Sequence, residues 1–403
     1  MIVRARIVVT MDGPPIDNGA VVVSGDRIVD VGSFPEINEK HSREEIVELG
    51  DRALLPGLIN AHCHLDYTCL RGRIPRQKSF TDWIRAINTE KAKLSAEDYI
   101  ASINDGFAEA KRFGTTTIAN LTGFPELVSR IESTIRTFWF AEVIDVRDPG
   151  RADEIVDSVI GQLKSREHWG LAPHAPFTVS ANLYRRCEEI AQREDILLTT
   201  HLAESHEEME MFRGARGALY EFLKEIGRPM ADCGEGTPLT EFLERSQAIG
   251  ANHPYLVVHL NELAGTDFDS LAELREKFSV VHCPRSHEYF GHAPFPFEKL
   301  GKLGFNICLG TDSLASNENL SHFTEMRAFQ NEFPNVAPEE ILKMVTVNPA
   351  RALGRENALG QIRRDFLADL IALPLTRSTF AIDEILALDG LVGWSMIDGR
   401  VSA

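Results

Sequence analysis

The chain has few cysteines, a deficit of positive charge and no long apolar run, and each absence excludes a class of protein. Its six cysteines are scattered through 403 residues without a Cys-x-x-Cys pair, which excludes a disulfide framework and indicates reduced thiols. The 42 Lys and Arg residues against 60 Asp and Glu give a formal charge of −18, which disfavours nucleic-acid and anionic-membrane partners. No apolar run reaches membrane-spanning length, and residues 1–9 carry no charged leader before an apolar core. We therefore expect a cytoplasmic protein that binds neither nucleic acid nor membrane.

The remaining composition is that of an ordinary globular protein, with 43% hydrophobic and 25% charged residues. Short apolar segments alternate with amphipathic helical segments about eight times, which predicts a closed parallel (β/α)8 TIM barrel. An open doubly wound sheet has a similar alternation, but no glycine-rich phosphate loop follows the first predicted strand. The predicted strands cover residues 51–60, 115–120, 138–145, 169–173, 196–201, 255–259, 279–282 and 306–312.

Both ends of the chain are rich in short β-like runs separated by turn residues. Because these runs flank the predicted barrel, we expect one small β-sandwich domain built from both termini. The predicted boundaries are residues 1–53 for the first part of the β domain, 54–352 for the barrel and 353–403 for the second part of the β domain.

Polar residues follow the carboxyl ends of the predicted strands, the face that carries the active site in a barrel. His62 and His64 are two residues apart, so on a strand both imidazoles point to one side and can reach one ion. Imidazoles together with one carboxylate suit Zn²⁺ or Fe²⁺. Further residues at such strand ends are His174, His201, His259, His282 and Asp312.

Other hydrolase motifs are missing. Residues 205–210 contain His-Glu without a second histidine four residues later, so they do not form a zincin helix. There is no Pro-Cys-x-x-Cys zinc motif and no Gly-x-Ser-x-Gly nucleophile turn. A cytidine-deaminase type of zinc site and a serine hydrolase are therefore unsupported.

Five ordered motifs resemble those of the amidohydrolase superfamily, in the branch of the guanine, cytosine and S-adenosylhomocysteine deaminases and the triazine hydrolases. The resemblance spans nearly the whole chain. The matching segments are residues 56–66 (PGLINAHCHLD), 201–204 (HLAE), His259, 282–284 (HCP) and 309–316 (LGTDSLAS).

The resemblance implies one divalent metal ion per chain, Zn²⁺ with Fe²⁺ as the alternative, held by His62, His64, His201 and Asp312. Members with two metals bridge them with a carboxylated lysine after the fourth strand, and residues 169–174 contain no lysine. This difference is our reason for predicting a single ion.

The resemblance also assigns roles in catalysis. Glu204 corresponds to the carboxylate that moves protons, and Asp312 takes the proton of the attacking hydroxide. His259 orients that hydroxide, and His174 lines the substrate pocket. Without the resemblance, a solvated residue at the start of a helix is the better interpretation of Glu204.

The implied reaction is hydrolytic deamination of a purine-like cyclic amidine with release of ammonia. Arg147 and Arg285 lie on rim loops and are candidates to bind a substrate carboxylate, and Trp83 is a candidate to stack on a ring. A carboxylate favours an adenine nucleoside with an acidic tail, such as aminodeoxyfutalosine or S-adenosylhomocysteine.

Several alternatives stay open at this stage. They are a guanine or pterin deaminase, a triazine-type chlorohydrolase, and a cyclic amide hydrolase that uses the same metal hydroxide. Residues 282–291 (HCPRSHEYFG) depart from many deaminases, which have Asn in place of His287 and a small residue in place of Arg285. The sequence also leaves a homo-oligomer possible in principle and fixes no subunit number.

Overall fold

A computed structural model describes residues 1–246, 255–377 and 382–402 of the chain. Within these residues the larger sheet is parallel throughout and has the order β13-β12-β11-β10-β9-β8-β7-β6-β14. Its strands are β6 (Leu58–His64), β7 (Thr115–Thr122), β8 (Arg136–Val143), β9 (Trp169–Pro173), β10 (Leu197–Leu202), β11 (Tyr255–His259), β12 (Phe278–His282), β13 (Asn306–Leu309) and β14 (Asp312–Ser313).

The sheet closes on itself because β14 pairs with β6, the first strand of the series. Asp312 lies opposite Cys63, and Ser313 lies opposite His64. β14 follows β13 after only two residues, so the two short strands together occupy the eighth position. The predicted (β/α)8 barrel is therefore confirmed.

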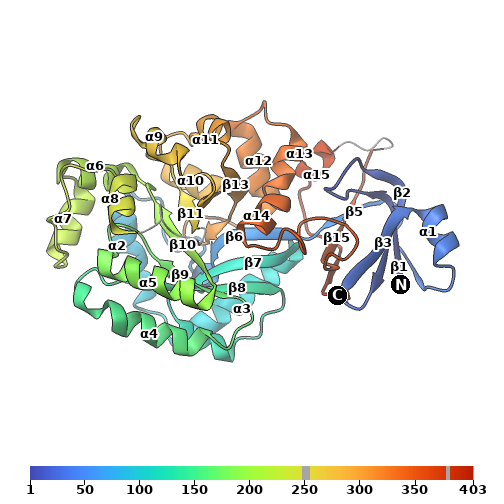
Figure 1. Cartoon of the computed structure of the whole chain (residues 1–403), viewed down its shortest axis with the longest axis horizontal. Coiled ribbons are helices and arrows are strands. Elements are labelled where there is room, and N and C mark those ends of the chain that lie inside the picture. Colours follow the sequence, from blue (N-terminus) through green and yellow to red (C-terminus); the bar gives the residue numbers. More distant parts are fainter. Residues whose placement is uncertain (247–254, 378–381, 403) are drawn as a thin grey trace.

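Helices surround the barrel, and α6 and α7 lie on the side furthest from the terminal strands (Figure 1). Serine side chains cap several of the helices that follow barrel strands; Ser95, for example, forms a capping box with Asp98 at the start of α3. The helices of the barrel part are α2 (Phe80–Lys91), α3 (Ala96–Arg112), α4 (Ala152–Leu163), α5 (Ala181–Glu194), α6 (His206–Gly214), α7 (Ala218–Glu225), α8 (Pro238–Arg245), α9 (Asp267–Ala272), α10 (Pro284–Phe290), α11 (Phe297–Leu303), α12 (His322–Glu332), α13 (Pro338–Lys343) and α14 (Val347–Ala352). Among the described residues, none of the helices has the length and apolarity needed to cross a membrane.

A second, mixed sheet is built from both ends of the chain, as the sequence predicted, and its blue and red strands lie side by side in Figure 1. It has the order β17-β16-β15-β5-β1-β2-β3, and β4 pairs with β1. The helix α1 (Phe34–Lys40) packs on it. The helix α15 (Asp383–Leu386) lies in the chain between β15 and β16. The strands are β1 (Ile2–Val8), β2 (Ile16–Ser24), β3 (Arg27–Ser33), β4 (Ile46–Glu48), β5 (Arg52–Pro56), β15 (Leu370–Pro374), β16 (Trp394–Ile397) and β17 (Arg400–Ser402).

The single strand predicted over residues 51–60 is in fact two strands that belong to different sheets. β5 ends at Pro56 in the terminal sheet, and β6 begins at Leu58 in the barrel. Gly57 joins them, and its N–H donates a hydrogen bond to the carbonyl of Asp369. A side chain at this position would lie 2.1 Å from the Thr116 hydroxyl, so only glycine fits between the two sheets.

We predict that Gly57→Ala lowers the free energy of unfolding by about 1–3 kcal/mol, because the added methyl group forces Thr116 out of a packed site. Gly161→Ala in α4 is the matched control: nothing lies within 4 Å of its added methyl, and alanine favours a helix over glycine by up to about 1 kcal/mol. Chemical denaturation of both variants measures the difference. Equal stability of the two variants would contradict the steric argument.

Candidate active site

Four side chains predicted as metal ligands meet at the carboxyl ends of the barrel strands. The Nε2 atoms of His64 and His201 are 3.3 Å apart. Asp312 Oδ1 lies 3.7 Å from His62 Nε2 and 3.9 Å from His64 Nε2. The potential ligand nitrogens of the three histidines all lie within 4.8 Å of one another. The barrel thus brings together residues that are as much as 250 positions apart in the sequence.

The protonation states of this cluster suit a cation. Burial and neighbouring imidazoles lower the pKa of His64 well below its usual range and that of His201 to about 3, so both rings are neutral. Burial alone would raise the pKa of Asp312, but contact with His62 and the charges of nearby histidines hold that pKa well below its usual range. Neutral imidazole and ionised carboxylate are the forms that bind metal.

Two hydrogen-bonding features strengthen the fit to a metal ion. Neither ring nitrogen of His62 has a hydrogen-bond partner among the described residues, although the side chain is fully buried. Such an orphaned polar group costs free energy unless a ligand occupies it. His201 Nδ1 lies 3.0 Å from the carbonyl oxygen of His174, an interaction that orients the ring so that Nε2 faces the cluster. Three imidazoles and one carboxylate form a donor set that fits Zn²⁺ or Fe²⁺.

Asp312 is held by the loops around it. Its backbone is left-handed (φ 55°), a conformation that costs about 1–3 kcal/mol in most residues and recurs at functional sites. The Ser286 hydroxyl donates to Asp312 Oδ2 at 2.6 Å, and the Ser313 N–H donates to Oδ1 at 2.8 Å. Ser316 is a more distant donor, at 3.4 Å from Oδ2. The carboxylate is therefore fixed before any ligand binds.

Glu204 lies in the loop between β10 and α6, and its side chain is buried rather than solvated. Its Oε1 lies 3.6 Å from His259 Nε2 and 4.0 Å from His292 Nε2. Burial and the nearby carboxylates of Asp312 and Glu208 raise the pKa of Glu204 well above its usual range. A carboxyl group with such a pKa carries a proton at neutral pH and can donate it.

The backbone of the Glu204 loop is held from two sides. The Glu204 N–H donates to Glu208 Oε2 at 2.8 Å, and its carbonyl accepts a hydrogen bond from Asn261 Nδ2 at 3.1 Å. His287 Nδ1 in turn lies 3.1 Å from Asn261 Oδ1. Sequence reasoning missed Glu208, Asn261 and Ser286, although Asn261 follows His259 by two residues and that spacing was an available signal.

A cavity of about 240 Å³ lies in front of the cluster. Apolar and aromatic side chains, among them Tyr67, Trp83 and Phe177, form much of its wall, so a flat heterocycle can pack there. The Nδ1 of His174 lies 2.6 Å from the Thr178 hydroxyl oxygen. The predicted site residues that line the cavity are His64, Trp83, His174, His201, Glu204, His259 and Asp312.

The structure does not bring the two predicted arginines to this cavity. Arg285 forms an ion pair with Glu318 at 2.7 Å, and neither Arg285 nor Arg147 lines the cavity. Among the described residues, the cationic side chain that does so is Lys91, whose Nζ lies 4.7 Å from the centre of the Tyr67 ring. Glu142, also missed from the sequence, lines the cavity beside His174 and His201.

The model of the Amidohydrolase family matches residues 53–392 of the chain. Over 378 residues the chain is 29% identical to the 5-methylthioadenosine/S-adenosylhomocysteine deaminase of Pyrococcus furiosus, which covers 88% of this chain and 83% of that protein. It is similar in structure to Helicobacter pylori aminofutalosine deaminase in complex with methylthio-coformycin, with a TM-score of 0.88, 22% identity and 100% coverage of both chains. It is also similar to an adenosine deaminase from Xanthomonas campestris with bound zinc, with a TM-score of 0.81, 24% identity, and coverage of 99% of this chain and 92% of that one. These two structures show that the fold is shared.

We predict that Ser286→Ala destabilises the metal-free protein by about 1.5–3 kcal/mol, because it removes a short hydrogen bond to an ionised, buried carboxylate. Ser316→Ala is the control, since its hydroxyl lies 3.4 Å from the same oxygen and the Ser286 bond remains. Denaturation of both chelator-treated variants provides the comparison. An equal loss of unfolding free energy in Ser316→Ala and Ser286→Ala would contradict the argument that the short hydrogen bond stabilises the protein more than the long one.

Proposed function

The chain belongs to the amidohydrolase family, and from this premise we propose that it is a metal-dependent hydrolase that deaminates an adenine nucleoside. The observation that carries the proposal is the buried, proton-carrying Glu204 facing the same cavity as His64, His201 and Asp312. In such a reaction a ring nitrogen of the substrate must gain a proton and the attacking water must lose one. These two transfers need one protonated and one ionised carboxyl group, and this cavity holds both. Similar proteins bear the names 5-methylthioadenosine/S-adenosylhomocysteine deaminase and aminofutalosine deaminase, which point to the same substrate class.

We assign one divalent ion per chain to His62, His64, His201 and Asp312, with zinc preferred because the similar Xanthomonas campestris protein has bound zinc. Such an ion supplies Lewis acidity and lowers the pKa of water from 15.7 to about 7.

The reaction then follows from the protein groups. An amidine carbon in an aromatic ring is a weak electrophile until its ring nitrogen is protonated, and Glu204 donates that proton. Asp312 accepts a proton from the attacking water, and the neutral imidazole of His259 forms a hydrogen bond that orients the attacking oxygen. Burial lowers the pKa of His259 well below its usual range, so it acts by positioning and not as a cation.

The second half of the reaction moves the same protons onward. A C–O bond has formed at the ring carbon, and the C–N bond to the amino group breaks as that nitrogen receives the proton held by Asp312. The new hydroxyl group loses its remaining proton to the Glu204 carboxylate and becomes the carbonyl, so both carboxyl groups return to their starting states. Water and the amidine thereby become a cyclic amide and ammonia, with no other reactant required.

We predict that Glu204→Gln lowers kcat for ammonia release by about 10²–10⁴-fold while metal content stays unchanged, because it removes the proton donor and no metal ligand. Glu210→Gln is the matched control, since Glu210 lies in α6 outside the cavity. The assay measures ammonia from adenosine derivatives, guanine, a pterin and a chlorotriazine. Ammonia from none of them, with chloride release from the triazine, would refute the proposed deaminase in favour of the hydrolase alternative.

We also predict one equivalent of divalent metal per chain, lost together with activity after His201→Ala, because this variant removes one of three imidazoles from the cluster. Elemental analysis of the purified protein measures the content and identifies zinc or iron. His206→Ala, a nearby exposed histidine, serves as the control and should keep its metal. Two equivalents per wild-type chain would contradict the single-ion proposal.

A further inference from the structure

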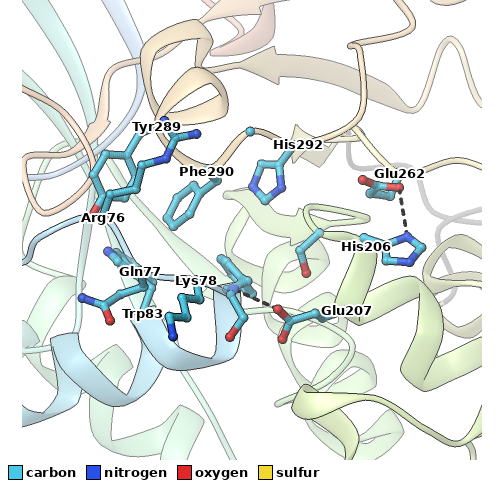
Figure 2. Close-up of a pocket in the computed structure, with 14 residues that line it drawn as sticks. Arg76, Gln77, Lys78, Trp83, His206, Glu207, Glu262, Tyr289, Phe290 and His292 are labelled. Atoms are coloured by element: carbon cyan, nitrogen blue, oxygen red, sulfur yellow. Dashed lines mark hydrogen bonds and ion pairs between the residues drawn. The ribbon is translucent and has the colours of Figure 1, made fainter.

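A second pocket, of about 160 Å³, is shown in Figure 2. It shares the lining residues Phe80 and Trp83 with the catalytic cavity. Two loops form it: residues 76–79, which precede α2, and residues 289–292, which end α10 and continue beyond it. The hydroxyl of Tyr289 donates to the carbonyl of Ile74 at 3.2 Å, so the two loops are in contact. We call this space the outer pocket.

The charges in the outer pocket are divided between its two sides. Arg76, Gln77 and Lys78 lie on one side, while Glu207 and Glu262 lie on the other (Figure 2). Both cations, Arg76 and Lys78, are exposed to solvent.

The two acidic groups already have partners. Glu207 accepts hydrogen bonds from the backbone N–H groups of Phe80 and Thr81 at the start of α2, at 2.8 and 3.1 Å. Glu262 accepts one from the Ala293 N–H at 3.1 Å. A carboxylate that caps a helix N-terminus is largely compensated by the helix dipole.

The cations have no carboxylate partner among the described residues. The guanidinium of Arg76 makes one polar contact, at 3.4 Å to the carbonyl oxygen of Glu288, and Lys78 makes no ion pair. Arginine binds carboxylates through two parallel N–H donors, and lysine adds a point charge. This side of the outer pocket is therefore ready to bind an anion.

The outer pocket also begins close to the proton donor. His292 lines it, and His292 Nε2 lies 4.0 Å from Glu204 Oε1 in the catalytic cavity. The catalytic cavity of about 240 Å³ is smaller than the roughly 300–1,000 Å³ usual for ligand sites, so a substrate larger than a nucleoside must extend beyond it. Phe80 and Trp83 line both spaces, so the two spaces adjoin at these side chains.

Aromatic side chains of the outer pocket are placed to contact the carbon part of such an extension. Phe290 packs edge-on against Trp83, with ring centres 5.0 Å apart, and both rings line the outer pocket. On the premise of the proposed function, we infer that the outer pocket binds a carboxylate at the end of a 5′ extension of the adenine nucleoside, through Arg76 and Lys78. Neither of the rim arginines, Arg147 and Arg285, lines the outer pocket.

The test compares three adenine nucleosides that differ only in the 5′ extension. Methylthioadenosine has a neutral extension, S-adenosylhomocysteine ends in an amino-acid carboxylate, and aminodeoxyfutalosine ends in an aryl carboxylate. The variants are the double substitution Arg76→Ala/Lys78→Ala and the control Arg73→Ala, an exposed cation of the same loop that lines neither cavity.

We expect the double variant to lower kcat/KM at least about tenfold for a carboxylate-bearing substrate and less than about twofold for methylthioadenosine, because only the former loses charge-assisted hydrogen bonds. Arg73→Ala should leave all three values unchanged. The carboxylate substrate that suffers the loss identifies which kind of tail the enzyme uses. Equal losses for all three substrates, or none for either carboxylate, would overturn the inference.

Two further outcomes separate this inference from the proposed function. If the wild type deaminates only methylthioadenosine, the carboxylate site is refuted while the deaminase stands. If no substrate releases ammonia, the proposed function fails. Calorimetric measurement of the binding of the two carboxylate compounds then tests whether the outer pocket binds a carboxylate. Binding to wild type that is lost in the double variant supports the site, and absence of binding to wild type overturns it.

Discussion

The parallel pairing of β14 with β6 is the constraint on which the rest of the site depends. It places Asp312 opposite Cys63 and therefore between His62 and His64, whose side chains point to the side of the strand away from that of Cys63. The Thr311 N–H bonds to the carbonyl of His62, and the Gly310 N–H bonds to that of His282, so both neighbouring strands fix the turn before Asp312. Closing the barrel and assembling the cluster are thus the same structural event.

Burial then separates the two carboxyl groups of the cavity. Both are enclosed, and burial by itself raises the pKa of each. Asp312 faces imidazoles that stabilise its ionised form, while Glu204 faces other carboxylates that favour its protonated form. One protonated and one ionised carboxyl group therefore result from the same desolvation, and the difference between them comes from the neighbouring groups that each one meets.

Sequence reasoning found the barrel and the histidine cluster because both depend on local patterns: the alternation of strands and helices, and polar residues at strand ends. It treated residues 51–60 as one strand because the apolar run is nearly continuous, whereas β5 and β6 pair in different sheets and Thr116 leaves room only for glycine at position 57 between them. It proposed Arg285 for substrate because of its place on the rim, but Glu318, distant in sequence, occupies that guanidinium. Contacts that depend on loop conformation, such as those of Glu208 and Ser286, leave no periodic signal, whereas the spacing of Asn261 from His259 was a local signal that went unused.

The segment 282–291 shows how a departure from a family pattern acquires a physical meaning. His287, which many deaminases replace by Asn, lies 3.1 Å from Asn261, and Asn261 holds the carbonyl of Glu204. Three residues further on, Phe290 forms part of the outer pocket wall. One segment therefore supports the loop of Glu204 through Asn261 and also forms part of the wall of the outer pocket. The chain has a net charge of −18, so a carboxylate substrate of the proposed kind needs cations close to its binding site. The loop before α2 supplies Arg76 and Lys78, which line the outer pocket together with residues 289–292.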